Sequence, residues 1–116
     1  MVKLDKEDLV ITPVSTHLDD VSGRRLQRVF DKHVQQGRLV HAVDLRLLST
    51  IDSPTLAALI RALRVVRYVG GSIAVIADQS HIRKVFSITG LDRIFPVYRN
   101  EHEVFAALGT PRRIPA

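Results

Sequence analysis

The stretch LVHAVDLRLLSTIDSPTLAALIRALRVVRYVGGSIAVIAD, residues 39–78, decides the fold. It begins with an apolar run over 39–45 and ends with another over 72–78, and both have the length and the β-branched residues of buried strands. Between them the pair Ser53-Pro54 predicts a helix start, with the serine as N-cap and the proline at the first helical position. Apolar residues then recur at helical spacing until Gly70-Gly71 ends the helix. This order predicts two parallel strands joined by a helical crossover.

The same alternation extends in both directions along the chain. Upstream, residues 9–14 predict a strand, and Pro13 assigns it to a sheet edge because proline cannot donate to a ladder. Further elements are a helix capped by Asp19 or Asp20 and closed by Gly37, a helix from the cap Ser80 to Gly90, a short strand over 95–98, and a helix that begins at Asn100. The chain therefore predicts one α/β domain.

Composition limits the class of protein. The 116 residues are 46% hydrophobic and 25% charged, which is typical of one globular domain. There is no cysteine, which excludes disulfides, thiolate metal sites and thiol nucleophiles and suggests a reducing compartment. The charged N-terminus does not resemble a signal peptide, and no segment approaches the ~20 apolar residues of a membrane span. We therefore expect a cytoplasmic protein that does not insert into membranes.

The basic charge balance does not by itself indicate nucleic-acid binding. Lys and Arg number 17 against 12 Asp and Glu, but they are interleaved with acids along the chain. The one dense group is Arg24, Arg25, Arg28 and Lys32 on a predicted helix. Aromatic residues for base stacking are only 5% of the chain, with no Trp, so no nucleic-acid partner is expected.

The loop between the buried strand and the central helix is the best candidate for chemistry. Free backbone N–H groups at a helix start favour an anion, and Ser53 stands there beside Asp52. Ser53 is either a simple helix cap or a functional hydroxyl. A hydrolase is not expected, because Ile51 and Thr55 occupy the glycine positions of G-x-S-x-G.

Other kinds of site lack a supporting pattern. His33 and His41 fall on apolar elements and are interpreted as core or border histidines. No metal-ligand spacing and no phosphate-binding glycine loop occurs, so no catalytic residue, metal or cofactor is predicted. On the central helix, Arg61, Arg64 and Tyr68 share the narrow face left for solvent.

Several motifs together resemble a known family. The chain is similar to STAS domains of the anti-sigma factor antagonist type, over roughly residues 9–108. The motifs that carry the resemblance are Leu18-Asp19 with Ser22-Gly23 and Leu26, Val43-Asp44-Leu45, Ile51-Asp52-Ser53, Leu56-Ala57-Ala58-Leu59, Gly70-Gly71, and TGLDRIFPVY over 89–98.

The resemblance implies a fold and a mode of action. It implies a STAS-like domain over residues 1–109, with a mixed sheet of four or five strands, about four flanking helices and no enzymatic activity; residues 110–116 are expected to be a disordered tail. It also implies that an anti-sigma factor serine kinase phosphorylates Ser53, that a phosphatase reverses this, and that only the unmodified protein binds the kinase. The expected partner-binding residues are Asp19, Asp52, Ser53, Pro54, Thr55, Arg61 and Arg64.

A second hypothesis stays open. The family commonly continues D-S-S-G or D-S-T-G, whereas Pro54 and Thr55 follow Ser53 here. The chain would then be a non-switching STAS scaffold, or an accessory subunit of a transporter or a multiprotein signalling complex.

Overall fold

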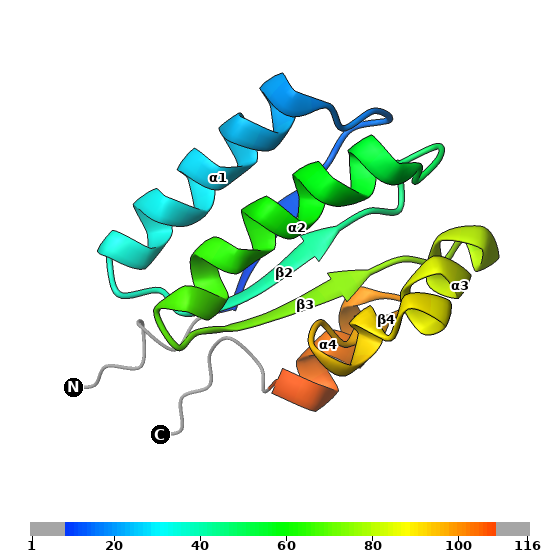
Figure 1. The fold of residues 1–116 in the computed structure, drawn as a ribbon. Helices are drawn as coiled ribbons and strands as arrows, with labels where there is room; N and C mark the ends of the chain where they lie inside the picture. Colours follow the sequence, from blue (N-terminus) through cyan, green and yellow to red (C-terminus); the bar gives the residue numbers. More distant parts are fainter. Residues whose placement is uncertain (1–8, 109–116) are drawn as a thin grey trace.

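The computed structural model describes residues 9–108 and contains the predicted alternation of strands and helices (Figure 1). The elements in chain order are β1 (Leu9–Pro13), α1 (Asp20–Gln35), β2 (Val40–Asp44), α2 (Ser53–Tyr68), β3 (Ser72–Ile76), α3 (Ser80–Thr89), a short 3-10 helix η2 (Leu91–Arg93), β4 (Val97–Tyr98) and α4 (Glu101–Leu108).

The four strands form one sheet in the order β1-β2-β3-β4. All three pairings are parallel, as the helical crossovers predict. The resemblance implied a mixed sheet, but no antiparallel pairing occurs within residues 9–108. β1 lies at an edge, and its last residue, Pro13, is exposed there. The prediction of an edge strand is therefore confirmed.

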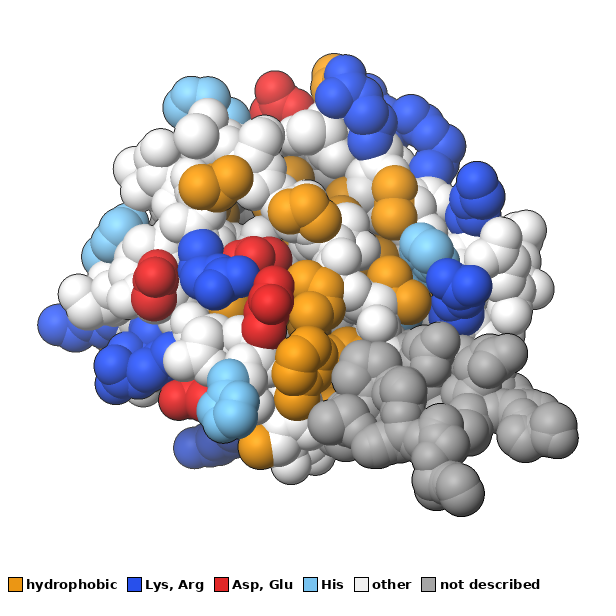
Figure 2. Space-filling model, turned by 180° about the vertical axis from the view of Figure 1, so that it is seen from behind, with side chains coloured by type: hydrophobic (Ala, Val, Ile, Leu, Met, Phe, Trp, Pro, Cys, Tyr) orange, Lys and Arg blue, Asp and Glu red, His pale blue; other side chains and the backbone are white. Residues whose placement is uncertain are grey.

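The two faces of the sheet bury different clusters. His41 and Val43 of β2 point toward α1 and α2, where the main core contains Phe30, Leu59 and Leu63. Side chains alternate along a strand, so Ala42 points to the other face and packs with Ile76 of β3 and Val104 of α4, with Leu9, Ile11, Tyr98 and Leu108 partly buried around them. This face, turned away from α1 and α2, shows hydrophobic side chains at the surface (Figure 2).

Helices α1 and α2 lie side by side over one face of the sheet, α3 lies beyond the end of β3, and α4 lies on the opposite face (Figure 1). The α1–α2 contact depends on Gly23, because a Cβ there would stand 3.1 Å from the Ala58 Cβ. At the end of α2, a Cβ on Gly71 would stand 2.7 Å from the Leu39 carbonyl oxygen, so the chain can enter β3 only with glycine at this position.

Some local predictions were wrong in detail. Asp52, not Ser53, is the N-cap of α2, and Ser53 and Pro54 are its first two residues. Gln79, not Ser80, precedes the first residue of α3, and no side chain caps that helix. In contrast, Asp19 caps α1, and Gly90 ends α3 in the left-handed conformation as expected. The predicted tail, 110–116, lies outside the described residues.

None of the helices within residues 9–108 is long and apolar enough to cross a membrane.

Candidate partner-binding site

The amino ends of α1, α2 and α3 lie at one edge of the molecule. Each of these helices follows a parallel strand, so each begins near the carboxyl edge of the sheet (Figure 1). Their dipoles direct partial positive charge toward this edge. Aspartate caps stabilise this partial positive charge at α1 and α2. Asp19 Oδ1 accepts a hydrogen bond from Ser22 N at 2.9 Å, and Asp52 Oδ1 accepts one from Thr55 N at 3.0 Å. These backbone hydrogen bonds lower the pKa of both carboxyl groups, so both stay ionised at neutral pH.

Ser53 is exposed at the tip of α2. Because Asp52 supplies the cap, the Ser53 hydroxyl is left free, and it has no hydrogen-bond partner within the described part of the chain. Pro54 is exposed beside it, whereas Thr55 is only 8% exposed and packs inward. The predicted site residues Asp52, Ser53 and Pro54 thus form one accessible corner, and Thr55 lies beneath it.

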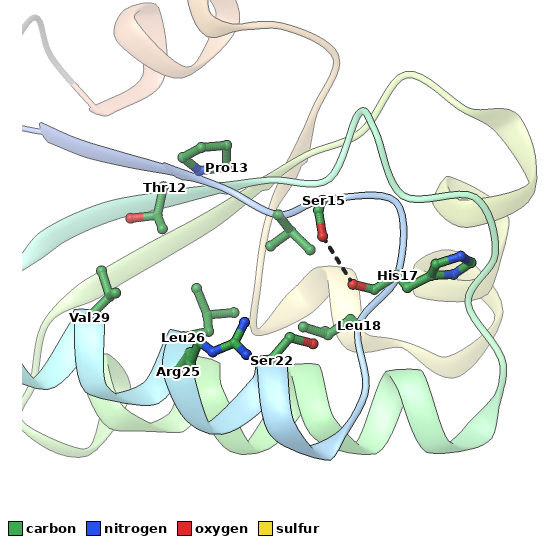
Figure 3. A pocket seen from close by; sticks show the side chains of 10 residues that line it. Thr12, Pro13, Ser15, His17, Leu18, Ser22, Arg25, Leu26 and Val29 are labelled. Carbon is green, nitrogen blue, oxygen red and sulfur yellow. Dashed lines mark hydrogen bonds between the residues drawn. The ribbon is translucent and has the colours of Figure 1, made fainter.

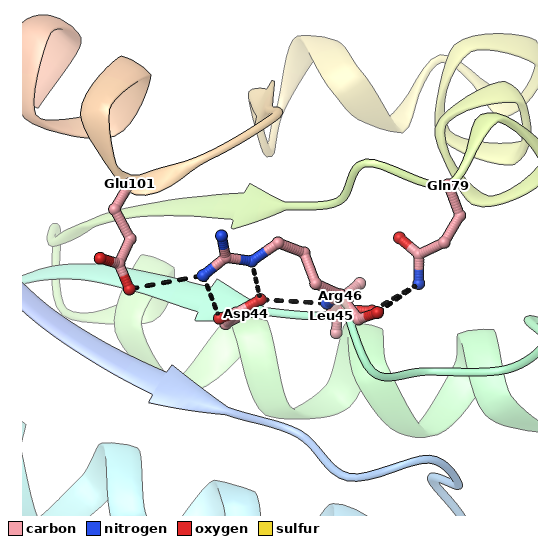
Figure 4. A network of polar contacts seen from close by, with 5 residues as sticks. All are labelled: Asp44, Leu45, Arg46, Gln79 and Glu101. Atoms are coloured by element: carbon pink, nitrogen blue, oxygen red, sulfur yellow. Dashed lines mark hydrogen bonds and ion pairs between the residues drawn. The ribbon is translucent and has the colours of Figure 1, made fainter.

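The loop that carries this corner is clamped from the start of α3. Gln79 Nε2 donates to the carbonyl oxygens of Leu45 at 2.8 Å and Arg46 at 3.2 Å (Figure 4). It also donates to the Leu48 carbonyl oxygen at 2.8 Å. In addition, His81 Nε2 lies 2.9 Å from the Ser49 carbonyl oxygen. Sequence reasoning missed this clamp; its one signal was a polar residue, Gln79, directly after the predicted strand 72–78.

A second contact ties the beginning of the loop to α4. Arg46 makes a two-pronged ion pair with Asp44, with Nε to Oδ1 at 2.9 Å and Nη2 to Oδ2 at 2.7 Å, and it also reaches Glu101 at 3.4 Å (Figure 4). The pair lowers the pKa of Asp44 and raises that of Arg46. The loop between β2 and α2 is therefore held from both α3 and α4.

The two predicted arginines lie farther along α2. Arg61 is about 12 Å from Ser53 along the helix axis and Arg64 lies one turn beyond it; both are exposed, as predicted. Arg61 Nη2 pairs with Asp20 Oδ1 of α1 at 3.0 Å. Asp20 follows the cap Asp19, so this ion pair connects the beginning of α1 with the middle of α2.

A shallow hollow of about 240 Å³ lies between β1 and α1 (Figure 3). Its lining includes Leu18, Ser22 and Leu26, and on its rim Ser15 Oγ donates to the His17 carbonyl oxygen at 3.4 Å. The hollow is adjacent to the Asp19 end of α1.

The histidines of α1 and β2 lie away from this edge. His41 is fully buried, with Nε2 2.7 Å from the Arg38 carbonyl oxygen, as the interpretation of a core histidine requires. His33 is half-buried, and its ring centroid lies 6.0 Å from that of His41. Within residues 9–108 no three His, Asp or Glu side chains are grouped so that they could hold a metal ion.

Comparison with known proteins gives one consistent result. The sequence profile of the STAS domain matches residues 1–104. The "Putative anti-sigma factor antagonist TM1081 homolog" of Thermotoga neapolitana is 31% identical over 93 residues, which are 79% of this chain and 82% of that protein. The anti-sigma F factor antagonist of Paenibacillus polymyxa is 26% identical over 94 residues, 80% of each chain.

Solved structures show the same fold. The crystal structure of a "putative anti-sigma factor antagonist" from Thermotoga maritima superimposes with a TM-score of 0.73 at 25% identity, covering 87% of both chains. The Bacillus cell fate determinant SpoIIAA in its phosphorylated form gives a TM-score of 0.64 at 20% identity, covering 93% of this chain and 95% of that one; this likeness concerns the fold alone.

Proposed function

The chain belongs to the STAS domain family, and on that premise we propose that it is a bacterial anti-sigma factor antagonist. In its unmodified form it binds an anti-sigma factor serine kinase in the cytoplasm, and phosphorylation of Ser53 releases it. A phosphatase restores the binding form.

The STAS family of anti-sigma factor antagonists is non-enzymatic, so the function of this chain is to bind. The relatives are named as antagonists of anti-sigma factors. A binding function needs an accessible surface and, for a switch, one group on it whose charge can change.

The free hydroxyl of Ser53 is the observation that carries this proposal. Asp52 caps α2, so Ser53 has no structural task in the described residues, and its side chain is exposed at the tip of the loop. A phosphate adds about −1.5 to −2 charges at pH 7. At a helix amino end this charge is tolerated by the fold, but beside the ionised Asp52 it changes the contact surface strongly.

Phosphorylation by the cognate kinase tests the proposal directly. Incubation with ATP and the anti-sigma kinase is expected to label Ser53 alone, since Thr55, the nearest other hydroxyl, is only 8% exposed. Peptide mass spectrometry identifies the labelled residue, and Ser53→Ala serves as the unlabelled control. Labelling of Thr55, or binding to the kinase with no labelling, would contradict the switch.

Calorimetry of the complex gives a second measurement. Ser53→Asp is expected to weaken binding by about tenfold or more through like-charge repulsion at the contact, and Ser53→Ala is expected to bind like the wild type. If both variants bind like the wild type, Ser53 lies outside the interface.

A non-switching scaffold or accessory subunit is the alternative, and the rigid corner favours it. The loop is clamped by Gln79 and His81, and Pro54 fixes the backbone directly after Ser53. Stable binding of a multiprotein complex, unchanged by Ser53→Asp, would identify this role.

A further inference from the structure

A continuous groove runs along the outer side of the α1–α2 pair. Three hollows of about 460, 230 and 340 Å³ follow one another there from the beginning of α1 to the end of α2. Neighbouring hollows share Arg24 and Gln27, or Asp31 and Val65, so they are parts of one groove. The close approach of the helices at Gly23 and Ala58 sets its floor near the α1 amino end.

Arginines dominate the walls of this groove. Arg24 and Arg28 of α1 face Arg61 and Arg64 of α2, against two aspartates, Asp20 and Asp31. Only Arg61 is paired, with Asp20; the other three arginines have no carboxylate within ion-pair distance in the described residues. The walls therefore carry an excess of positive charge, in guanidinium groups whose planar fork fits carboxylates.

The far end of the groove is apolar and aromatic. Tyr68 is 92% exposed and Val69 47% exposed, next to the half-buried Val65. An exposed tyrosine beside arginines has the composition of binding hot spots. A ligand for the whole groove therefore needs carboxylates first and a hydrophobic side chain after them.

We propose that the α1–α2 groove is a docking groove for an acidic peptide segment of a protein partner, with the carboxylates on Arg24, Arg28 and Arg64 and an apolar residue against Tyr68. This rests in part on the proposed function, because the groove begins beside Asp20, at the molecular edge that carries Ser53, so one partner can reach both. Among the described residues, Tyr68 is the one aromatic residue that lines the groove, which is too few for base stacking along a nucleic-acid strand. The concave shape of the groove between two helices suits a peptide chain more than a flat anionic membrane.

The test compares two charge reversals of equal size. The double variant Arg24→Glu/Arg64→Glu reverses the charge of two arginines in the groove. The control Arg25→Glu/Arg93→Glu makes the same change in net charge outside the groove, because Arg25 faces the hollow beside β1 and Arg93 lies on η2. The probe is a fluorescein-labelled peptide of glutamates followed by leucine and phenylalanine, measured by fluorescence anisotropy at low salt. The groove variant is expected to weaken binding by about tenfold or more and the control by less than about twofold, and Tyr68→Ser is expected to weaken it as well.

Three outcomes would overturn the docking groove: no binding of the peptide to the wild type, equal weakening by both double variants, or groove-dependent binding only to phosphatidylserine vesicles. The kinase reaction separates this proposal from the previous one. If the kinase labels Ser53, the groove variant is expected to raise KM about tenfold with kcat unchanged. If Ser53 is never labelled but the peptide binds the groove, the phosphoswitch fails and the docking groove stands.

Discussion

At the scale of single residues, the most informative feature is that Asp52 caps α2 while the neighbouring Ser53 hydroxyl stays free. Both residue types are good N-caps, but the structure assigns the cap to Asp52, whose carboxylate accepts from Thr55 N. The helix cap and the free, exposed hydroxyl thereby belong to adjacent side chains.

This separation leads to a stability prediction. Asp52→Ala is expected to lower the melting temperature by about 3–8 °C because the helix loses its cap, whereas Asp52→Asn is expected to retain most of the stability. Ser53→Ala is expected to melt within about 1 °C of the wild type, because its hydroxyl caps nothing. Differential scanning calorimetry measures all three, and a large loss in Ser53→Ala alone would return the capping role to Ser53.

His41 makes stability depend on pH. Its ring packs edge-on to Phe30, lies near His33, and has only the Arg38 carbonyl oxygen as a polar partner; burial is the main cause that lowers its pKa. Burial, with the nearby charges of Arg38 and Lys32, also lowers the pKa of His33. Below about pH 6.5 the unfolded chain therefore binds more protons than the folded one. The free energy of unfolding is then highest above that pH and falls as the pH drops.

The matching measurement is thermal melting from pH 8 down to pH 5. The melting temperature of the wild type is expected to fall by several degrees below about pH 6.5. His41→Gln can still donate to the Arg38 carbonyl oxygen but does not titrate, so its melting temperature is expected to fall less than that of the wild type. His102→Gln, on the exposed first turn of α4, is the matched control, and a wild-type curve that stays flat would contradict the assignment.

At the scale of elements, the amide of Gln79 joins α3 to the loop before α2. Gln79→Met keeps the length of the side chain but removes the hydrogen bonds that its amide donates to three carbonyl oxygens. We expect a loss of about 1–3 kcal/mol in unfolding free energy. We also expect amide hydrogen exchange over residues 45–52 to become faster than the loss in unfolding free energy alone would make it. Gln36→Met, at the exposed end of α1, is the control, and unchanged exchange in the loop would show that the clamp does not order it.

At the scale of the whole molecule, the main core connects β2 and β3 with α1, α2 and α3. Phe30 of α1, Leu63 of α2, Val75 of β3 and Phe86 of α3 belong to the same cluster. Such a core has no boundary at which one part could unfold alone.

The prediction for the whole molecule is a single cooperative transition. Urea unfolding followed by circular dichroism and by tyrosine fluorescence is expected to give one midpoint, and Phe30→Ala is expected to shift both signals together by about 3–5 kcal/mol. Tyr68→Ala, at a side chain 92% exposed, is expected to leave stability nearly unchanged. Two separated transitions would show that the helices do not share one core.

The sequence by itself determined the order of the elements, and it singled out the loop that carries the candidate site. Apolar periodicity, Pro13 at the edge and the glycines that end the helices are local signals, because each depends on the backbone geometry of a few consecutive residues. The Asp52-Ser53 corner was found in the same way. The choice of cap between these two neighbours was missed, because either side chain can bond to the same free N–H groups.

The tertiary structure alone decided what surrounds that corner. Gln79 meets the Leu45 carbonyl 34 positions away, Arg61 meets Asp20 at a separation of 41, and Arg46 meets Glu101 at a separation of 55. No periodicity records such contacts, because they arise when the crossovers bring distant helices onto one sheet. The α1–α2 groove has the same origin: its arginines come from two helices, and only the packing of α1 beside α2 brings them to one groove.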